Sequence, residues 1–173
     1  MASGFDSRFN PLGAVENNLL EWRYSNRSVE QAKANARAHY GLGEAFYRLW
    51  LDDPLKMYTC AYWPDDRPDD RPGGTTTLEQ AQRQKIDHVC RKIRLAEGER
   101  FIDIGCGFGG FMFRALETTG AGGNGLNTTT EQVEWLRGEI VRRGLGDRLT
   151  VREADFRDID MQYDKVVSIG VLE

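Results

Sequence analysis

The stretch FIDIGCGFGG, residues 101–110, decides the fold of this chain. An apolar run, Phe101–Ile104, leads directly into glycines at alternate positions, Gly105, Gly107 and Gly109. A short apolar run that ends in glycines predicts a buried strand followed by a tight turn. The end of this strand carries very little side-chain bulk, which indicates either a close turn or a ligand that approaches the backbone.

The sequence around this stretch alternates predicted strands with predicted helices. Capping boxes at Thr77–Gln80 and Thr128–Glu131 each predict the start of a helix, and the first helix extends to about Arg94. A further helix is predicted at 111–116, and short strands at 101–104, 149–151 and 166–169, with a weaker strand at 124–126 because glycine is a poor strand former. Strands that alternate with helices predict βαβ units and a parallel sheet. The predicted fold class is therefore α/β.

The first 76 residues carry a different pattern. Residues 1–27 mix glycine, proline, asparagine and charges, and predict a loose arm. A capping box at Ser28–Gln31 predicts a helix to about Tyr40, and Glu44–Leu51 predicts a second short helix rich in aromatic residues. The tandem repeat PDDRPDDRPGG, residues 64–74, predicts an exposed loop.

Composition limits the classes of function. A net charge of −4 and a pI of about 5.3 argue against a nucleic-acid-binding protein, which would carry a basic face. Three cysteines without metal-binding spacing and only two histidines make a zinc site unfavourable. The odd cysteine count and the absence of an apolar signal peptide predict free thiols in a reducing cytoplasm. We expect no transmembrane segment, because no apolar run approaches the ~20 residues of a membrane span.

Three classes of ligand compete for the glycine turn. A nucleoside triphosphate requires lysine and a hydroxyl after the last glycine, but Phe111 and Met112 follow Gly110. A dinucleotide requires an acid on the second strand for its ribose, and the segment Gly125–Asn127 offers none. S-adenosylmethionine has no phosphates; it needs close backbone approach and an acid for its ammonium group, and the stretch from Asp103 to Gly109 supplies both.

Six segments in order resemble the cyclopropane-fatty-acid synthases, including the mycolic-acid cyclopropane synthases and fatty-acid C-methyltransferases. The segments are MYTCAYW, TTLEQAQRQKID, FIDIGCGFGG, GLNTTTEQ, READFRDI and YDKVVSIGVLE, and the resemblance covers roughly residues 36–173. It implies a Rossmann-like class I methyltransferase fold with an incomplete parallel sheet and a helical N-terminal segment. Residues 1–76 would form an arm, helices and a cofactor-covering loop, and residues 77–173 the first half of the cofactor-binding domain.

The resemblance implies a chemistry and a substrate. The enzyme would use S-adenosylmethionine to methylate an unsaturated acyl chain of a membrane phospholipid, from the cytoplasm or as a peripheral membrane protein. Methyl transfer to an alkene leaves a carbocation, and a base must then remove a proton so that a ring can close. A water-poor site protects the cation, and no metal is required.

The resemblance also assigns individual residues. Cofactor contacts are implied for Tyr58, Thr59, Asp103, Gly105, Gly107, Gly109, Thr128, Gln132, Asp155, Phe156 and Ile169. The base would be a bicarbonate ion supported by Cys60, with Glu173 as the acidic partner. Without the resemblance, Cys60 reads as a small buried residue, Asp155 as a turn cap, and Phe156 and Ile169 as core.

The end of the sequence departs from the family pattern. The motif at Glu173 continues with histidine in the family, and the remaining strands and much of the acyl-chain pocket follow. We therefore expect a truncated member that is inactive alone, with an unpaired edge strand open to self-association. Two other functions remain open: a non-catalytic module that binds cofactor or lipid, and a related small-molecule N-methyltransferase. A nicotinamide-binding domain is a further, weaker alternative.

Overall fold

The computed structural model describes residues 11–25, 28–63 and 77–171, and its centre is a four-stranded parallel sheet. The strand order is β3-β2-β1-β4. The strands are β1 (Arg100–Ile104), β2 (Gly122–Asn127), β3 (Leu149–Glu153) and β4 (Lys165–Ser168). The predicted α/β class and the parallel sheet are confirmed. The PDDRPDDRPGG repeat and Glu173 lie outside the described residues.

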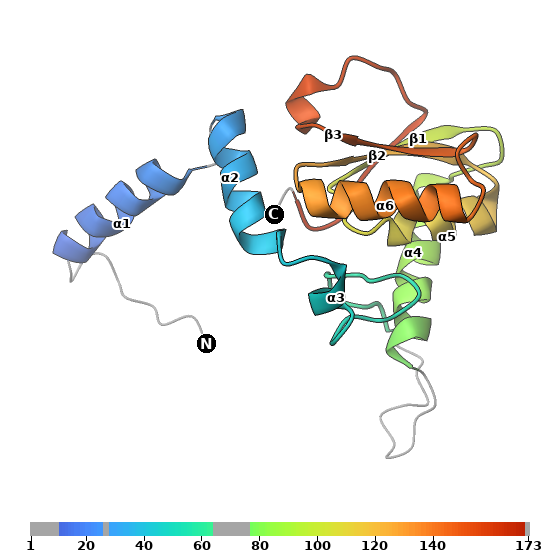
Figure 1. Cartoon of the computed structure of the whole chain (residues 1–173), viewed down its shortest axis with the longest axis horizontal. Helices are drawn as coiled ribbons and strands as arrows, with labels where there is room; N and C mark the ends of the chain where they lie inside the picture. The colour runs from blue at the N-terminus through green and yellow to red at the C-terminus, as the bar shows by residue number, and fades with distance from the viewer. Residues whose placement is uncertain (1–10, 26–27, 64–76, 172–173) are drawn as a thin grey trace.

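Three helices cover one face of the sheet: α4 (Leu78–Ile93), α5 (Gly110–Thr119) and α6 (Thr130–Arg142) (Figure 1). Helix α4 begins at the predicted capping box, since the Thr77 hydroxyl accepts from the Gln80 amide and the Gln80 side chain accepts from the Thr77 amide. The apolar faces of the helices meet the sheet in one core that includes Ile86, Phe101, Phe111, Met112 and Leu136.

Strand β2 is rich in glycine because bulky neighbours occupy the space that its side chains would take. A Cβ added at Gly123 would lie 2.4 Å from the ring of Phe101, and one at Gly125 would lie 2.6 Å from the Sγ of Cys106. Glycine is a poor strand former by itself, so packing against the helix-covered face accounts for this strand.

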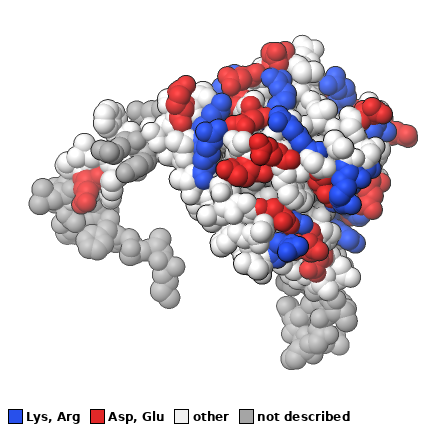
Figure 2. Space-filling model, viewed as in Figure 1, with Lys and Arg blue, Asp and Glu red and all other residues white. Residues whose placement is uncertain are grey.

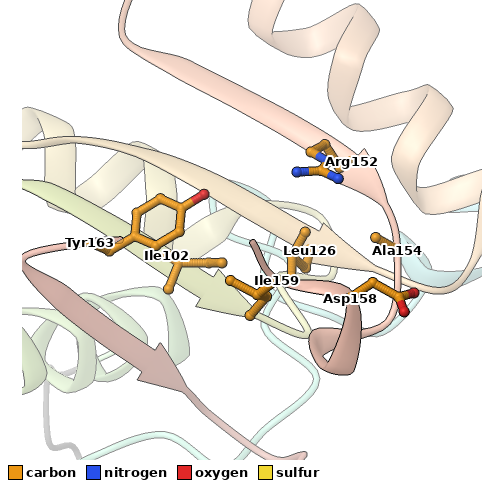
Figure 3. A pocket seen from close by; sticks show the side chains of 7 residues that line it. All are labelled: Ile102, Leu126, Arg152, Ala154, Asp158, Ile159 and Tyr163. Carbon is orange, nitrogen blue, oxygen red and sulfur yellow. The ribbon is translucent and has the colours of Figure 1, made fainter. Parts of the chain in front are cut away.

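The opposite face of the central strands is covered by the segment between β3 and β4. This segment contains the short 3-10 helix η2 (Phe156–Asp158). Its residues Ile159 and Tyr163 lie beside Ile102 of β1 and Leu126 of β2 (Figure 3). Ile102 and Leu126 are buried as a result, so irregular chain supplies the second layer of this part of the sheet.

The N-terminal segment contains α1 (Pro11–Tyr24), α2 (Val29–Tyr40) and α3 (Glu44–Tyr47). The prediction of a loose arm over residues 1–27 is wrong for α1, where Pro11 occupies the first helical position, a place that suits proline. Helix α1 lies beyond α2 and apart from the sheet (Figure 1). Helix α3 is shorter than the predicted Glu44–Leu51, because the chain continues in turns after Tyr47.

The capping box predicted at Thr128–Glu131 is also wrong. The N-cap of α6 is Thr129, and its hydroxyl makes no capping hydrogen bond. The side chain of Asn127 accepts from the Thr129 amide instead, at 3.1 Å, and this bond shifts the start of the helix by one residue.

The surface offers two observations on partners. Strand β4 forms one edge of the described sheet, and Val166 is 61% exposed there. Figure 2 shows Lys and Arg side chains interspersed with Asp and Glu over the face that carries α6. Arg142 and Arg143 of α6, for example, both form ion pairs with Glu139. These arginines therefore belong to a solvated helix face of mixed charge rather than to a basic patch.

Candidate functional site

A cavity of about 620 Å³ opens at the carboxyl ends of the strands. Ligands of open parallel sheets bind at this edge, and the volume lies within the usual range for small-molecule sites. Its floor comes from the ends of β1 and β2 and the glycine turn, and its walls come from α2, the segment 56–59, η2 and the residues after β4.

The glycine turn places backbone against the cavity. Gly107 has φ +53°, and a Cβ added there would meet no atom within 4 Å, so its face is open toward the space it lines. Gly109 has φ +78°, and a Cβ there would lie 2.5 Å from Leu136 of α6. The two glycines therefore serve different needs: Gly107 leaves room for a ligand, and Gly109 lets the turn lie against the Leu136 side chain of α6.

A polar network joins the turn to the exit of β2. The side-chain Nδ2 of Asn127 donates to Gln132 Oε1 at 2.7 Å and to the Gly107 carbonyl at 3.5 Å. Both side chains are buried and both line the cavity. Asn127 stands at the position where a dinucleotide-binding domain carries its ribose acid. The sequence prediction missed Asn127 as a site residue, although its place at the end of the second strand was the available signal.

Thr129 contributes an unused polar atom to the same wall. Its hydroxyl is buried and has no hydrogen-bond partner within the described protein, and the residue lines the cavity. A buried hydroxyl without a partner is costly, so a polar ligand group that reaches it would be stabilised.

The far wall is formed by Asp155, Phe156 and Arg157. The Asp155 carboxylate caps η2 through the Arg157 amide at 3.0 Å and holds the Arg157 guanidinium at 2.7 and 2.8 Å. This guanidinium lowers the pKa of Asp155, which therefore stays ionised. Phe156 is 42% exposed and presents an aromatic ring to the cavity, a surface on which a flat heterocycle can stack.

Asp103 lies beneath the glycine turn rather than among the residues that line the cavity. It is 3% exposed, and burial raises its pKa to about 7. Burial also raises the pKa of the Cys106 thiol well above its usual range, with the neighbouring Asp103 charge adding to the effect. Asp103 is therefore a buried, readily protonated acid on the helix-covered side of β1.

The segment 52–63 enters the site without forming a helix or strand. The buried Asp52 carboxylate accepts from the amides of Leu55 and Met57 at 3.1 and 2.9 Å. This loop carries Tyr58 and Thr59 to the cavity wall. The Tyr58 ring packs edge-on against aromatic rings of the N-terminal helices and the chain after α3, namely His39, Tyr40, Tyr47 and Trp50.

Helix α2 closes the cavity from above the sheet edge. None of its residues is buried, and it contributes Ala32, Asn35, Ala36, His39 and Tyr40 to the wall. Arg37 fixes it to the sheet, since its guanidinium meets Glu153 at 2.7 Å and Thr130 at 3.3 Å. The sequence predicted this helix but gave it no site residue, because its contacts lie far away in the chain.

Most predicted cofactor residues come together at this cavity. Those that line it are Tyr58, Thr59, Gly105, Gly107, Thr128, Gln132, Asp155, Phe156 and Ile169. Asp103 and Gly109 lie just behind the lining, and Cys60 is exposed and outside it. Among the described residues, no cluster of three or more His, Cys, Asp or Glu side chains could hold a metal ion.

Comparison with known proteins identifies the family. The model of the family described as mycolic acid cyclopropane synthetase matches residues 27–173. The chain belongs to this family. The predicted resemblance is confirmed, and with it the S-adenosylmethionine-dependent methyltransferase class of the relatives.

Curated relatives and solved structures of cyclopropane synthases agree with this assignment. The chain is 40% identical over 137 residues to a probable fatty acid methyltransferase of Pseudomonas putida, covering 78% of this chain and 32% of the relative. It is 31% identical over 150 residues to the cyclopropane-fatty-acyl-phospholipid synthase of Escherichia coli strain K12, covering 87% and 36%. The mycolic acid cyclopropane synthase CmaA1, complexed with SAH and CTAB, superposes with a TM-score of 0.71 at 35% identity, covering 80% and 45%.

The chain spans between about a third and a half of the length of these cyclopropane synthase relatives. Coclaurine N-methyltransferase shares the fold at 21% identity with a TM-score of 0.61. The glycine turn, the exit of β2 and η2, which border the cavity, lie within the residues that the family model matches.

Proposed function

We propose that this chain binds S-adenosylmethionine in the cavity at the carboxyl ends of β1 and β2. The observation that supports this most directly is the open face of Gly107, whose backbone meets the cavity with nothing in front of it. The orphan hydroxyl of Thr129 and the exposed ring of Phe156 fit a ligand that has both polar groups and a flat heterocycle.

The cavity walls divide naturally between the two ends of this cofactor. Phe156 would stack on the adenine, with Asp155 beside it, and Gln132 and Thr128 lie toward the ribose. Tyr58 and Thr59 would contact the methionyl end, across the glycine turn. Asp103 lies behind the turn, and its negative charge would become more favourable once an ammonium group stands nearby.

When bound, the cofactor would supply an electrophilic methyl group. The chain's own residues would orient it and exclude water, because the wall from α2 to Tyr58 carries mostly aromatic rings and alanines, with Lys56 as its charged member. We propose an unsaturated acyl chain of a phospholipid as the acceptor. The confirmed family supports this, and the relative CmaA1 is complexed with CTAB, a lipid-like molecule.

The proposed base is a bicarbonate ion held near Cys60. Cys60 is exposed and follows Thr59, so an ion beside its thiol would lie next to the cavity wall. Glu173, the proposed acidic partner, lies outside the described residues. Of the two groups proposed to act with this ion, only Cys60 is among the described residues.

The proposed meeting point with a membrane is the region around α3. Phe46, Leu49 and Trp50 are all exposed there, at 43%, 80% and 48%, and Tyr58 adjoins them. Apolar and aromatic side chains of this kind suit an interfacial contact. No helix in the described ranges is long and apolar enough to cross a bilayer.

Calorimetric titration of S-adenosylmethionine into the purified chain tests the proposal, with NADH as the control. Binding of S-adenosylmethionine alone supports it. Binding of NADH, or of neither compound, contradicts it. A separate assay with cofactor and unsaturated phospholipid tests catalysis: we expect no cyclopropane or methyl-branched product from the 173-residue chain alone, and any product refutes that part.

The exposed β4 edge carries a second proposal, self-association through strand pairing. Light scattering should show dimers whose fraction falls in a Val166→Lys variant, since a charge on an edge strand opposes pairing. A stable monomer at high protein concentration would exclude it.

A further inference from the structure

The irregular segment 52–63 depends on side chains from elsewhere for its shape. It has no strand partner, yet Tyr58 and Thr59 must hold fixed positions to form a binding wall. Helix α4 supplies the support: Gln82 Nε2 donates to the Thr59 carbonyl at 3.0 Å, and the Tyr62 backbone N–H donates to the Ala81 carbonyl at 3.3 Å.

Lys85 makes the densest set of these contacts. Its ammonium donates to Thr59 Oγ1 at 2.7 Å, to the Thr59 carbonyl at 3.3 Å and to the Cys60 carbonyl at 3.1 Å. The residue is only 8% exposed. An ammonium has three N–H donors, so these acceptors use all of them and leave none for an anion or a substrate.

We propose that Lys85 is a positioning residue that locks the Thr59–Cys60 backbone, and thereby shapes the part of the cavity that takes the amino-acid end of the cofactor. The proposal rests on the proposed S-adenosylmethionine site. It follows from where the three bonds go: two end on Thr59, which lines the cavity, and one ends on Cys60, the residue after it.

The charge of Lys85 adds a pH signature. Burial lowers its pKa to about 8, and the neighbouring Cys60 and Asp52, which would raise it, only partly oppose this. A neutral amine has two N–H donors, so one of the three acceptors loses its partner as the pH rises above this value. The hydrogen bonds that hold Thr59 and Cys60 against Lys85 should therefore weaken under mildly alkaline conditions.

The test compares Lys85→Met with Lys92→Met, an exposed lysine on the same helix. Each protein is titrated with S-adenosylhomocysteine and with methylthioadenosine, which lacks the amino-acid part. Lys85→Met should lower the affinity for S-adenosylhomocysteine about tenfold or more, because charge-assisted hydrogen bonds are lost. It should lower the affinity for methylthioadenosine by less than about twofold. Lys92→Met should change neither. The tenfold gap between wild type and Lys85→Met should narrow from pH 7 to pH 9.5.

Alkylation of the exposed Cys60 thiol gives a second reading that needs no cofactor. Lys85→Met should change the rate of modification, because Cys60 loses both its backbone anchor and the adjacent ammonium charge. If the wild-type chain binds no S-adenosylhomocysteine, the proposed function fails. The alkylation rate of Cys60 still tests whether Lys85 holds the Thr59–Cys60 backbone. If Lys85→Met does not fold, Lys85→Gln, which removes the charge and shortens the side chain but keeps a polar end, should give the same difference between the two ligands.

If Lys85→Met lost the same affinity for both ligands, Lys85 would have a general structural role, and the proposal would be overturned. Unchanged affinity together with an unchanged alkylation rate would overturn it as well.

Discussion

Two glycines of the same turn are expected to fail in opposite ways when replaced by alanine. Gly107 and Gly109 both have positive φ, at +53° and +78°. An added Cβ at Gly107 points into open space, whereas at Gly109 it would lie 2.5 Å from the Leu136 side chain and 3.2 Å from Phe113. The first change should therefore damage binding, and the second should damage the fold.

The magnitudes follow from these distances. Left-handed backbone costs an alanine about 1–2 kcal/mol at either position. At Gly109 the clash adds overpacking of about 1–3 kcal/mol, because Leu136 is fully buried and has little room to move. Gly109→Ala should thus destabilise the chain by roughly 2–5 kcal/mol, and Gly107→Ala by roughly 1–2 kcal/mol.

Urea unfolding measures the stability of both variants, and calorimetry with S-adenosylhomocysteine measures binding. Gly107→Ala should remain folded at room temperature and lose most of its affinity, because its methyl group enters the cavity. Gly109→Ala, where it folds, should bind close to the wild-type value. Wild-type affinity in Gly107→Ala, or wild-type stability in Gly109→Ala, would refute the division of roles within the turn.

Three further predictions concern charge and thiols. The folded pKa of Asp103, about 7, lies above its unfolded value of about 3.9, so its protonated form favours the folded state. Between pH 4 and pH 7 the free energy of unfolding of the wild type, measured in urea, should fall by up to roughly 4 kcal/mol more than that of Asp103→Asn. Parallel pH profiles of the two unfolding free energies would contradict this. Arg37→Ala should lower stability by less than about 1 kcal/mol, because its ion pair is half exposed, yet speed hydrogen exchange in α2; unchanged exchange would remove its anchoring role. Iodoacetamide at pH 8 should modify Cys60 alone in mass spectra, since burial raises the pKa values of Cys90 and Cys106; a second adduct on the folded chain would contradict their burial.

The sheet and the turn could be predicted from local sequence because local patterns cause them. Helix α4 carries both halves of its capping box and one apolar face, and β1 is a short apolar run that ends in glycine. The glycines of β2 gave a weaker signal, since their reason is the bulk of Phe101, Cys106 and Met112, which lie on other elements. Tertiary packing, rather than strand propensity, made that segment a strand.

The site was less predictable than the fold, because its supports lie far apart in the sequence. Lys85 contacts residues 25 and 26 positions earlier, and Arg37 contacts Glu153 at a separation of 116 residues. No local pattern encodes such pairs. The predicted start of α6 was wrong for a different reason. Thr128 and Thr129 both suit an N-cap position, and the hydrogen bond from the Thr129 backbone N–H to Asn127 Oδ1 decides between them.

Helix α2 has a consequence for how the chain is made. It has no buried residues of its own, and its ion pair needs Glu153 at the end of β3. During synthesis, at about 5–20 residues per second, α2 would leave the ribosome on the order of ten seconds before that partner exists. This wall of the binding site therefore exists before the strand end that holds it, and in that interval its aromatic neighbours are exposed to chaperones and proteases.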